Sequence, residues 1–308
     1  MTPTSAGPVG VVVPTHDRPQ LLRETLHSVL AQDTGADLDV VVVYDRAEPD
    51  EALTSLSAPG RRVRVIPNSR TPGLAGARNT GVLALDTELV AFCDDDDTWL
   101  PGKLTAQLAR LAAAPGTDLV TTAITVAFDG TETPRLAGTE TVARGDLLRS
   151  RMAMLHSSTF LLRRTALLGG LGLVDEAIPG SQNEDWDLLL RASARHPVAH
   201  VDQPLVRVRW GASSHFSRQW QTRVDSLEWM LDRHPDLRSA GAGTARVYGQ
   251  LAFGHAALGH RREAARWAAR ATRVNWREPR SLVALAVASG AVGADSVMTT
   301  LHRRGRGL

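Results

Sequence analysis

Four consecutive aspartates, Asp94 to Asp97, follow a short apolar run in the segment "ELVAFCDDDDTWLPGKL" (88–104). Carboxylates a few Å apart repel one another by roughly 3–4 kcal/mol per close pair at an effective dielectric near 20. Two arrangements relieve that repulsion: the aspartates splay into water on an acidic loop that caps the helix starting at Pro101, or a cation lies among them. Carboxylate oxygens are the ligands that Mg²⁺ prefers and that suit Mn²⁺, so the cluster predicts either an acidic loop or a divalent-metal site.

A second acidic group, Glu184 and Asp185, opens the segment "NEDWDLLLRASAR" (183–195). Acidic residues in the first turn of a helix stabilise it by about 0.3–1 kcal/mol, and by themselves these two need no other explanation. A carboxylate can also remove a proton from a reacting hydroxyl, which contributes about 10²–10⁴-fold to a rate. The pair is therefore either helix-end charge or a general base with its neighbour.

Alternating strands and helices position the first acidic group. Short β-branched runs predict buried strands, and the amphipathic segments between them predict helices. We expect strands at 9–13, 39–45, 62–66 and 88–93, and helices at 20–32, 73–85 and 101–114. This alternation predicts a parallel sheet that is covered by helices on both faces.

Polar residues follow three of these strands at the point where each strand ends. His16 comes after the first strand, Asp45 ends the second, and Asp94 to Asp97 follow the fourth. In open parallel sheets, ligands bind beyond the carboxyl ends of the strands. The sequence therefore brings all three groups to one edge of the sheet.

The pattern changes after residue 118. A hairpin is expected around 119–132, further strands at 157–164 and 204–210, and a helix at 183–195. From about residue 216 the signal is helical to the end, and we assign no chemistry to that helical region.

Composition restricts the class of protein. The chain has 308 residues, a net charge of +2 and a single cysteine, Cys93, so it forms no internal disulfide and suits a reducing compartment. We expect no signal peptide, and no segment reaches the ~20 apolar residues of a membrane helix. Lys103 is the only lysine beside 34 arginines, which indicates codon bias rather than a surface for nucleic acid.

Several segments in order resemble family 2 glycosyltransferases: "VVVPTHDRPQLLRETLHSVLAQ", "VVVYD", "GLAGARNTGVLAL", "ELVAFCDDDDTWLPGKL" and "NEDWDLLLR". The resemblance covers roughly residues 8 to 217. It implies an α/β fold of the GT-A (Rossmann-like) type, with a mixed, mainly parallel sheet flanked by helices and a C-terminal α-helical appendage. The expected domain is 1–222, with a nucleotide-sugar-binding half (8–115) and an acceptor-binding half (116–222), followed by an α-helical region (223–308).

The resemblance implies a role for each aspartate of the cluster. Asp94 and Asp96 would hold Mn²⁺ or Mg²⁺, and Asp95 would face the ribose of the donor nucleotide. Such a cation would offset the charge that grows on the diphosphate as the sugar leaves. Asp97 is expected to cap the following helix rather than bind the metal.

The resemblance also implies the remaining donor contacts. Asp45 would accept hydrogen bonds from the base, typically uracil, and the loop Pro14–Thr15–His16 would lie against the nucleotide. The family commonly has Tyr and Asn where this chain has His16 and Asp17. In this chain, His16 would stack on the base in place of the tyrosine. Arg78 would pair either with phosphate or with the aspartate cluster, and a structural salt bridge is the equally weighted alternative.

On the acceptor side, the resemblance implies that Asp185 is the general base of an inverting reaction and that Glu184 binds the acceptor. His156 is either an acceptor contact or a core histidine. His215 is a candidate third metal ligand, as in some relatives, but it stands farther from Arg209 than the family histidine does, and its role stays unassigned. "VRVRW" (206–210) has Val206 where processive polysaccharide synthases carry Gln or Arg, so transfer of a single sugar fits better.

The resulting expectation is a metal-dependent hexosyltransferase that uses a nucleotide-diphospho-sugar, UDP-linked, and a hydroxyl acceptor such as a glycan, a lipid-linked sugar or a small molecule. The alternatives are a catalytically inactive donor-binding scaffold and a sugar-phosphate nucleotidyltransferase, whose glycine-rich loop after the first strand is missing here. We expect a cytoplasmic protein that binds no nucleic acid. Peripheral association with the inner face of the membrane and homo-oligomerisation through the helical tail both stay open.

Overall fold

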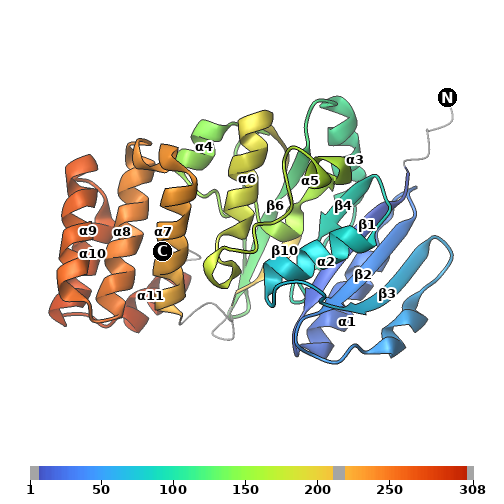
Figure 1. The fold of residues 1–308 in the computed structure, drawn as a ribbon, viewed down its shortest axis with the longest axis horizontal. Coiled ribbons are helices and arrows are strands. Elements are labelled where there is room, and N and C mark those ends of the chain that lie inside the picture. The colour runs from blue at the N-terminus through green and yellow to red at the C-terminus, as the bar shows by residue number, and fades with distance from the viewer. Residues whose placement is uncertain (1–6, 211–218, 304–308) are drawn as a thin grey trace.

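A computed structural model describes residues 7–210 and 219–303. One sheet runs through the first two thirds of the chain, and helices extend from it to one end of the molecule (Figure 1). The strands lie in the order β3-β2-β1-β4-β9-β6-β10-β5, with β7 paired to β6 and β8 paired to β10. Their bounds are β1 Val9–Thr15, β2 Leu38–Tyr44, β3 Arg61–Pro67, β4 Leu89–Phe92, β5 Thr98–Trp99, β6 Leu119–Phe128, β7 Thr131–Arg135, β8 Thr141–Val142, β9 Leu161–Arg163 and β10 Val198–Arg209.

The sheet is parallel in its first half and mixed in its second. β3, β2, β1 and β4 are mutually parallel, as the buried valine runs predict. β9 then lies antiparallel between β4 and β6, and β6 pairs in parallel with β10. The expected mixed, mainly parallel sheet is confirmed, and its carboxyl edge gathers the loops after β1, β2 and β4.

The helices cover both faces of this sheet. Their bounds are α1 Pro19–Leu30, α2 Leu74–Ala84, α3 Lys103–Ala113, α4 Arg144–Arg149, α5 Arg164–Leu168, α6 Glu184–Arg195, α7 Trp220–Arg233, α8 Ala242–Ala257, α9 Arg261–Val274, α10 Pro279–Ser289 and α11 Ala294–Arg303. Short 3₁₀ turns occur at Glu51–Leu56, Ser157–Thr159, Pro179–Ser181 and Pro235–Arg238.

Alternation along β1 divides the core into two layers. Val11 and Val13 pack with α1 and α3 on one face, whereas Val12 packs with α2 and α6 on the other. α2 approaches β1 closely because Gly81 has no side chain: a Cβ there would lie 2.3 Å from Cγ1 of Val12. This close approach packs the C-terminal half of α2 directly against β1.

Two local predictions are corrected. The expected strand at 157–164 is a 3₁₀ turn at Ser157–Thr159 followed by the short β9, because the Thr159 and Phe160 N–H groups donate to the His156 and Ser157 carbonyls and close a turn there. The prediction that Asp97 caps the next helix is wrong. α3 begins at Lys103, and its N-cap is Gly102 in a left-handed conformation with no side-chain cap.

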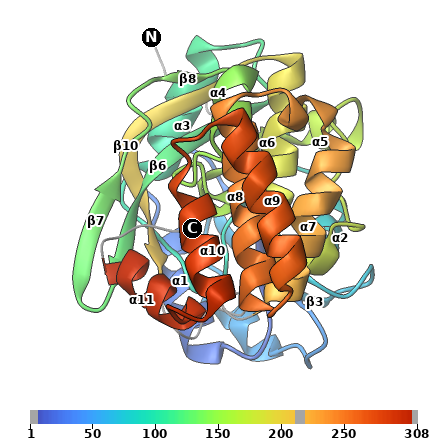
Figure 2. The same cartoon turned by 90° about the vertical axis from the view of Figure 1, so that its left-hand side faces the viewer.

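The C-terminal helices divide between two cores. α7 and part of α8 add Val224, Met230 and Leu251 to the core that also holds α2 and α6. The rest of α8 packs with α9, α10 and α11 around a separate cluster that includes Phe253, Ala268 and Ala284. Figure 2 shows α9 and α10 at this end of the molecule. The domain boundary at 222/223 stays a prediction, and α7 packs with the sheet-covering layer. In the described ranges, no helix has the length and apolarity needed to cross a bilayer.

Candidate active site

The loop after β4 and the loop after β1 form one polar network at the carboxyl edge of the sheet. The Thr15 hydroxyl donates to an Asp95 carboxylate oxygen at 2.8 Å. Arg18 donates to Asp95 at 3.3 Å and to Asp96 at 2.5 Å. Burial raises the pKa of Asp95 to about 6, although the Thr15 hydrogen bond acts in the opposite direction. The structure thus places the predicted donor residues Thr15 and Asp95 side by side.

Arg78 joins the two halves of the site. Its side chain is 1% exposed, and it donates to Asp94 at 2.6 Å, to Ser157 at 2.8 Å and to Glu184. Burial disfavours the guanidinium charge, but Asp94 and Glu184 outweigh it, so the pKa of Arg78 lies above its ordinary value. Of the alternatives for Arg78, the structure shows pairing with the aspartate cluster, and the same guanidinium also reaches the acidic end of α6.

The two carboxylates that share Arg78 differ in their electrostatics. For Asp94, burial is outweighed by Arg78, and its pKa is lowered. For Glu184, burial dominates over Arg78, and the neighbouring charge of Asp185 adds to it, so the pKa rises to about 7. Asp94 therefore stays ionised at neutral pH, while Glu184 lies close to its titration point.

Asp185 is held by an arginine from another segment. Nη2 of Arg151 lies 2.9 Å from each Asp185 carboxylate oxygen, and the backbone N–H of Trp186 donates to Asp185 at 2.7 Å. Burial works against the Asp185 charge, but Arg151 outweighs it, and the pKa of Asp185 is lowered. The carboxylate is thus ionised and oriented. Sequence reasoning missed Arg151, because the loop after α4 carries no recognisable motif.

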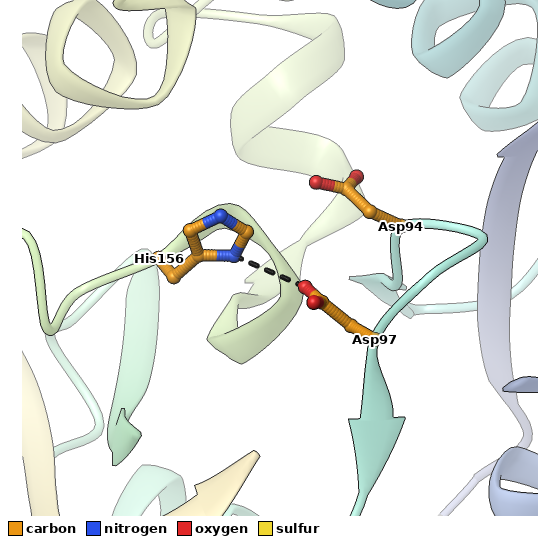
Figure 3. A group of neighbouring side chains, drawn as sticks. All are labelled: Asp94, Asp97 and His156. Atoms are coloured by element: carbon orange, nitrogen blue, oxygen red, sulfur yellow. Dashed lines mark ion pairs between the residues drawn. The ribbon is translucent and has the colours of Figure 1, made fainter. Parts of the chain in front are cut away.

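A third group of side chains, Asp97, Ser158 and His156, lies beside Asp94. Asp97 accepts from the Ser158 hydroxyl at 2.5 Å, and Nδ1 of His156 lies 3.3 Å from an Asp97 oxygen. Ligand atoms of Asp94, Asp97 and His156 all lie within 4.8 Å of one another (Figure 3). Two carboxylates and one imidazole form a donor set that fits Mn²⁺ and, through its oxygens, Mg²⁺.

The predicted metal ligand Asp96 is not part of this group, because its carboxylate is paired with Arg18. Asp94 is common to the predicted pair and to the observed group. The sequence alone indicates only an acceptor contact or a core residue for His156. Its place could have been found only from the fold, since the turn at Ser157–Thr159 is what carries it to Asp97.

The turn at Ser157–Thr159 rests on the buried residues Lys103 and Gln107. Nζ of Lys103 lies 3.7 Å from the centre of the Trp99 ring and donates to Gln107 at 2.8 Å. Gln107 in turn donates to the Thr159 carbonyl at 2.6 Å. Burial lowers the pKa of Lys103 to about 7. The one lysine of the chain thus holds Gln107, and through it the turn at Ser157–Thr159 that lies beside the acidic loop.

Asp45 lies at the end of β2, next to the loop that carries His16. Its carboxylate accepts from the Gly73 N–H at 3.0 Å and from Asn68 at 2.8 Å, while Nδ1 of His16 lies 2.7 Å from its carbonyl oxygen. Pro14 is buried as part of β1. The predicted base-binding residues therefore share one end of the sheet edge. His215 falls in 211–218, outside the described residues.

Comparison with known proteins places this geometry in a family. The model of glycosyl transferase family 2 matches residues 10–169, more than half of the chain. Among curated proteins, the chain is 28% identical over 103 residues to the UDP-Glc:alpha-D-GlcNAc-diphosphoundecaprenol beta-1,3-glucosyltransferase WfgD of Escherichia coli. That match covers 33% of this chain and 40% of the relative, and the chain spans 35–40% of the length of the first curated relatives it matches.

Two solved structures are similar to the whole fold. S. aureus TarS 1-349 in complex with UDP-GlcNAc gives a TM-score of 0.62 at 16% identity, over 97% of this chain and 92% of that one. The mannosyltransferase PcManGT from Pyrobaculum calidifontis, in complex with GDP-Man and Mn²⁺, gives a TM-score of 0.54 at 19% identity. It covers 97% of this chain and 80% of the mannosyltransferase. These likenesses confirm the expected GT-A fold.

Proposed function

The chain belongs to glycosyl transferase family 2, and from that membership we propose that it moves one sugar from a UDP-linked donor to a hydroxyl acceptor with inversion. One observation carries the proposal: buried Arg78 joins Asp94, on the donor side, to Glu184, beside Asp185. The Arg78 guanidinium therefore fixes the distance between a carboxylate of the donor loop and those that would act on the acceptor.

The donor would lie along the carboxyl edge of β1, β2 and β4. Asp45 and His16 would take the base, and Asp95, hydrogen-bonded to Thr15, would take the ribose. TarS has been solved with UDP-GlcNAc, and the name of WfgD specifies UDP-Glc, which supports a UDP-linked sugar. Arg78 is already paired with two carboxylates, so its role here is to position Asp94 rather than to hold phosphate.

A divalent ion, Mn²⁺ or Mg²⁺, would be held by Asp94 together with the predicted Asp96, or with Asp97 and His156 as grouped in the structure. When bound, it would supply positive charge against the diphosphate leaving group. The Mn²⁺ in the similar mannosyltransferase supports this assignment. Arg18, paired with Asp95 and Asp96, would hold the loop after β4 in place.

Asp185 would accept the proton of the acceptor hydroxyl. It stands at the start of α6, ionised because Arg151 lowers its pKa, and Arg151 and the Trp186 N–H fix its orientation. Glu184, buried beside it, would contact the acceptor. With the base and the leaving nucleotide on opposite sides of the sugar, attack would invert the anomeric carbon.

We infer the class of acceptor from the name of one relative. WfgD is named for a diphosphoundecaprenol-linked sugar, and we propose a lipid-linked acceptor for this chain too, which implies peripheral contact with a membrane.

Two measurements test the proposal. UDP should raise the melting temperature of the wild type with Mn²⁺ and much less without it, because ligands that bind only the folded state stabilise it. Asp185→Asn should keep this stabilisation but lower donor turnover about 10²–10⁴-fold. Asp175→Asn, an acidic residue of the loop before α6, is the matched control and should leave turnover unchanged. Near-normal turnover in Asp185→Asn would remove Asp185 from the mechanism, and an absence of UDP stabilisation would contradict the donor site.

A further inference from the structure

α9 and α10 lie at the end of the molecule opposite β3 (Figure 1). The sequence of this end carries a concentration of positive charge. Residues 261–280 contain seven arginines and two glutamates, a net charge of +5. The whole chain has 35 basic and 33 acidic residues, so the other 288 residues carry 28 and 31, a net charge of −3. One short segment therefore gives the protein its positive balance.

The arginines of α9 lie on one face of the helix. Arg262, Arg266 and Arg270 are spaced by four residues, Arg273 follows three residues later, and all four are exposed. Among the described residues, only Arg266 of these four lies within 4 Å of a carboxylate, at 3.9 Å from Glu263. We call these four arginines the basic stripe. Carboxylates of the described residues therefore neutralise little of its positive charge, although Arg270 also lies over the Trp267 ring, 4.5 Å from the ring centre.

Exposed apolar side chains continue from the end of the basic stripe. Val274 follows Arg273 directly and is 44% exposed, and Trp276, in the turn before α10, is 74% exposed. Leu282 and Leu285 lie three residues apart on α10 and are 72% and 43% exposed. We call these four residues the apolar edge. Arg277 stacks on Trp276, with its guanidinium 5.0 Å from the ring centre, so a cationic and an apolar side chain are in contact in the turn between α9 and α10.

We propose that the basic stripe and the apolar edge together form a docking surface for an anionic phospholipid bilayer. Arginines near such a surface are attracted to lipid phosphates, and tryptophan and leucine enter the boundary between headgroups and acyl chains. A nucleic acid would use the arginines but would leave Leu282 and Leu285 in water. The inference rests on the proposed function in one respect: a lipid-linked acceptor requires the enzyme at a membrane.

Sedimentation of the full chain with vesicles tests this surface. The wild type should bind vesicles of phosphatidylcholine mixed with phosphatidylglycerol, should bind phosphatidylcholine alone much less, and should be released by salt. The triple variant Arg262→Glu, Arg266→Glu, Arg273→Glu should bind mixed vesicles at least about tenfold more weakly, since each arginine contributes to the attraction. Trp276→Ser with Leu282→Ser should weaken binding without changing its salt dependence.

The matched control is Arg62→Glu, Arg149→Glu, Arg238→Glu. These three arginines are exposed, lie on β3, α4 and the 3₁₀ turn at Pro235–Arg238, and give the same change in net charge. The control should bind vesicles several-fold more tightly than the α9 variant. Equal loss in both variants, or equal binding of the wild type to both vesicle types, would overturn the proposal.

Other occupants of the surface give distinct results. Displacement of the wild type from vesicles by duplex DNA, or a mass in solution that falls from dimer to monomer in the α9 variant, would overturn the bilayer proposal in favour of that occupant. Stabilisation by UDP with Mn²⁺ is measured on the same preparations. If it persists while vesicle binding is absent, only the docking surface is refuted; if it is absent while vesicle binding persists, only the proposed function is refuted.

Discussion

Arginine serves opposite purposes in two regions of this protein. At the sheet edge, Arg78 is 1% exposed and pairs with carboxylates from two separate segments. On α9, the arginines of the basic stripe are exposed, and their charge faces solvent. The difference shows that burial, rather than residue type, decides whether a charge organises the inside of a site or acts on what lies outside the molecule.

The largest effect is expected where the charge is buried. Arg78→Ala leaves Asp94 and Glu184 without their shared cation, and breaking a buried pair in this way costs about 3–5 kcal/mol of unfolding free energy. Urea denaturation measures the loss. Arg164→Ala, which removes a partly buried arginine from the same side of the sheet, is a control and should cost much less. Equal losses in both variants would mean that the buried bridge from Arg78 to Asp94 and Glu184 contributes no more to stability than the contacts of Arg164.

The second largest effect is expected on metal affinity, which should depend on Asp94. Asp94→Asn should lower the affinity for Mn²⁺ in the presence of UDP at least about tenfold, because one carboxylate ligand is lost. Titration calorimetry measures this, and Asp33→Asn, an exposed aspartate after α1, should bind Mn²⁺ normally.

Two further variants separate the ligand sets. Asp96→Ala should also weaken Mn²⁺ binding if the predicted Asp94–Asp96 pair holds the ion. Unchanged Mn²⁺ affinity in Asp96→Ala, together with a loss in Asp97→Asn, would replace that pair with Asp94, Asp97 and His156.

Acid should weaken the fold through Glu176, a partly buried carboxylate in the loop before α6 that pairs with Arg70, Thr71 and Asn79. Burial disfavours the Glu176 carboxylate, but hydrogen bonds from Asn79, Thr71 and Arg70 outweigh it and hold its pKa at about 2. A carboxyl whose pKa is lower in the folded state stabilises the fold above its ordinary pKa near 4.5. That contribution is lost as the pH falls from there toward 2. By pH 3.5 the loss should be about 1 kcal/mol.

Glu176→Gln removes this titration. Its unfolding free energy should therefore fall less than that of the wild type between pH 6 and pH 3.5, as urea denaturation at each pH would show. Parallel pH profiles for the two proteins would contradict the role of Glu176.

The smallest effect is expected on the basic stripe. Arg262→Ala and Arg273→Ala should each change the unfolding free energy by no more than about 0.5 kcal/mol, since neither has a carboxylate partner among the described residues. A loss comparable to that of Arg78→Ala would remove the contrast between the two regions.

Sequence alone predicts the parallel half of the sheet, and the meeting of the loops after β1, β2 and β4 at one edge, for physical reasons. Continuous apolar, valine-rich runs such as 9–13 are typical of strands that are buried on both faces of a parallel sheet. The residues that follow such strands lie at the same edge of the sheet. The family was therefore identified correctly, and Asp95 indeed lies beside Thr15. The assigned roles of the individual site residues stay predictions.

The acceptor side was less predictable. Arg151 and His156 lie in irregular segments between α4 and β9, where no periodicity indicates which way a side chain points. Their proximity to Asp185 and Asp97 depends on pairings more than 30 residues apart in sequence. Asp97 was assigned to a helix cap because it precedes Pro101, but the left-handed Gly102 starts α3 without it.

The insertion of β9 between β4 and β6 bears on how the chain reaches its native state. A fragment ending near residue 115 would contain the four parallel strands yet leave β4 as an open edge and Arg78 without Glu184. Such a fragment should be prone to self-association and should become ordered when the remainder of the chain is supplied in trans. We therefore predict that residues 8–115 do not fold as an autonomous unit, and that Arg78 reaches Glu184 only when the sheet is completed.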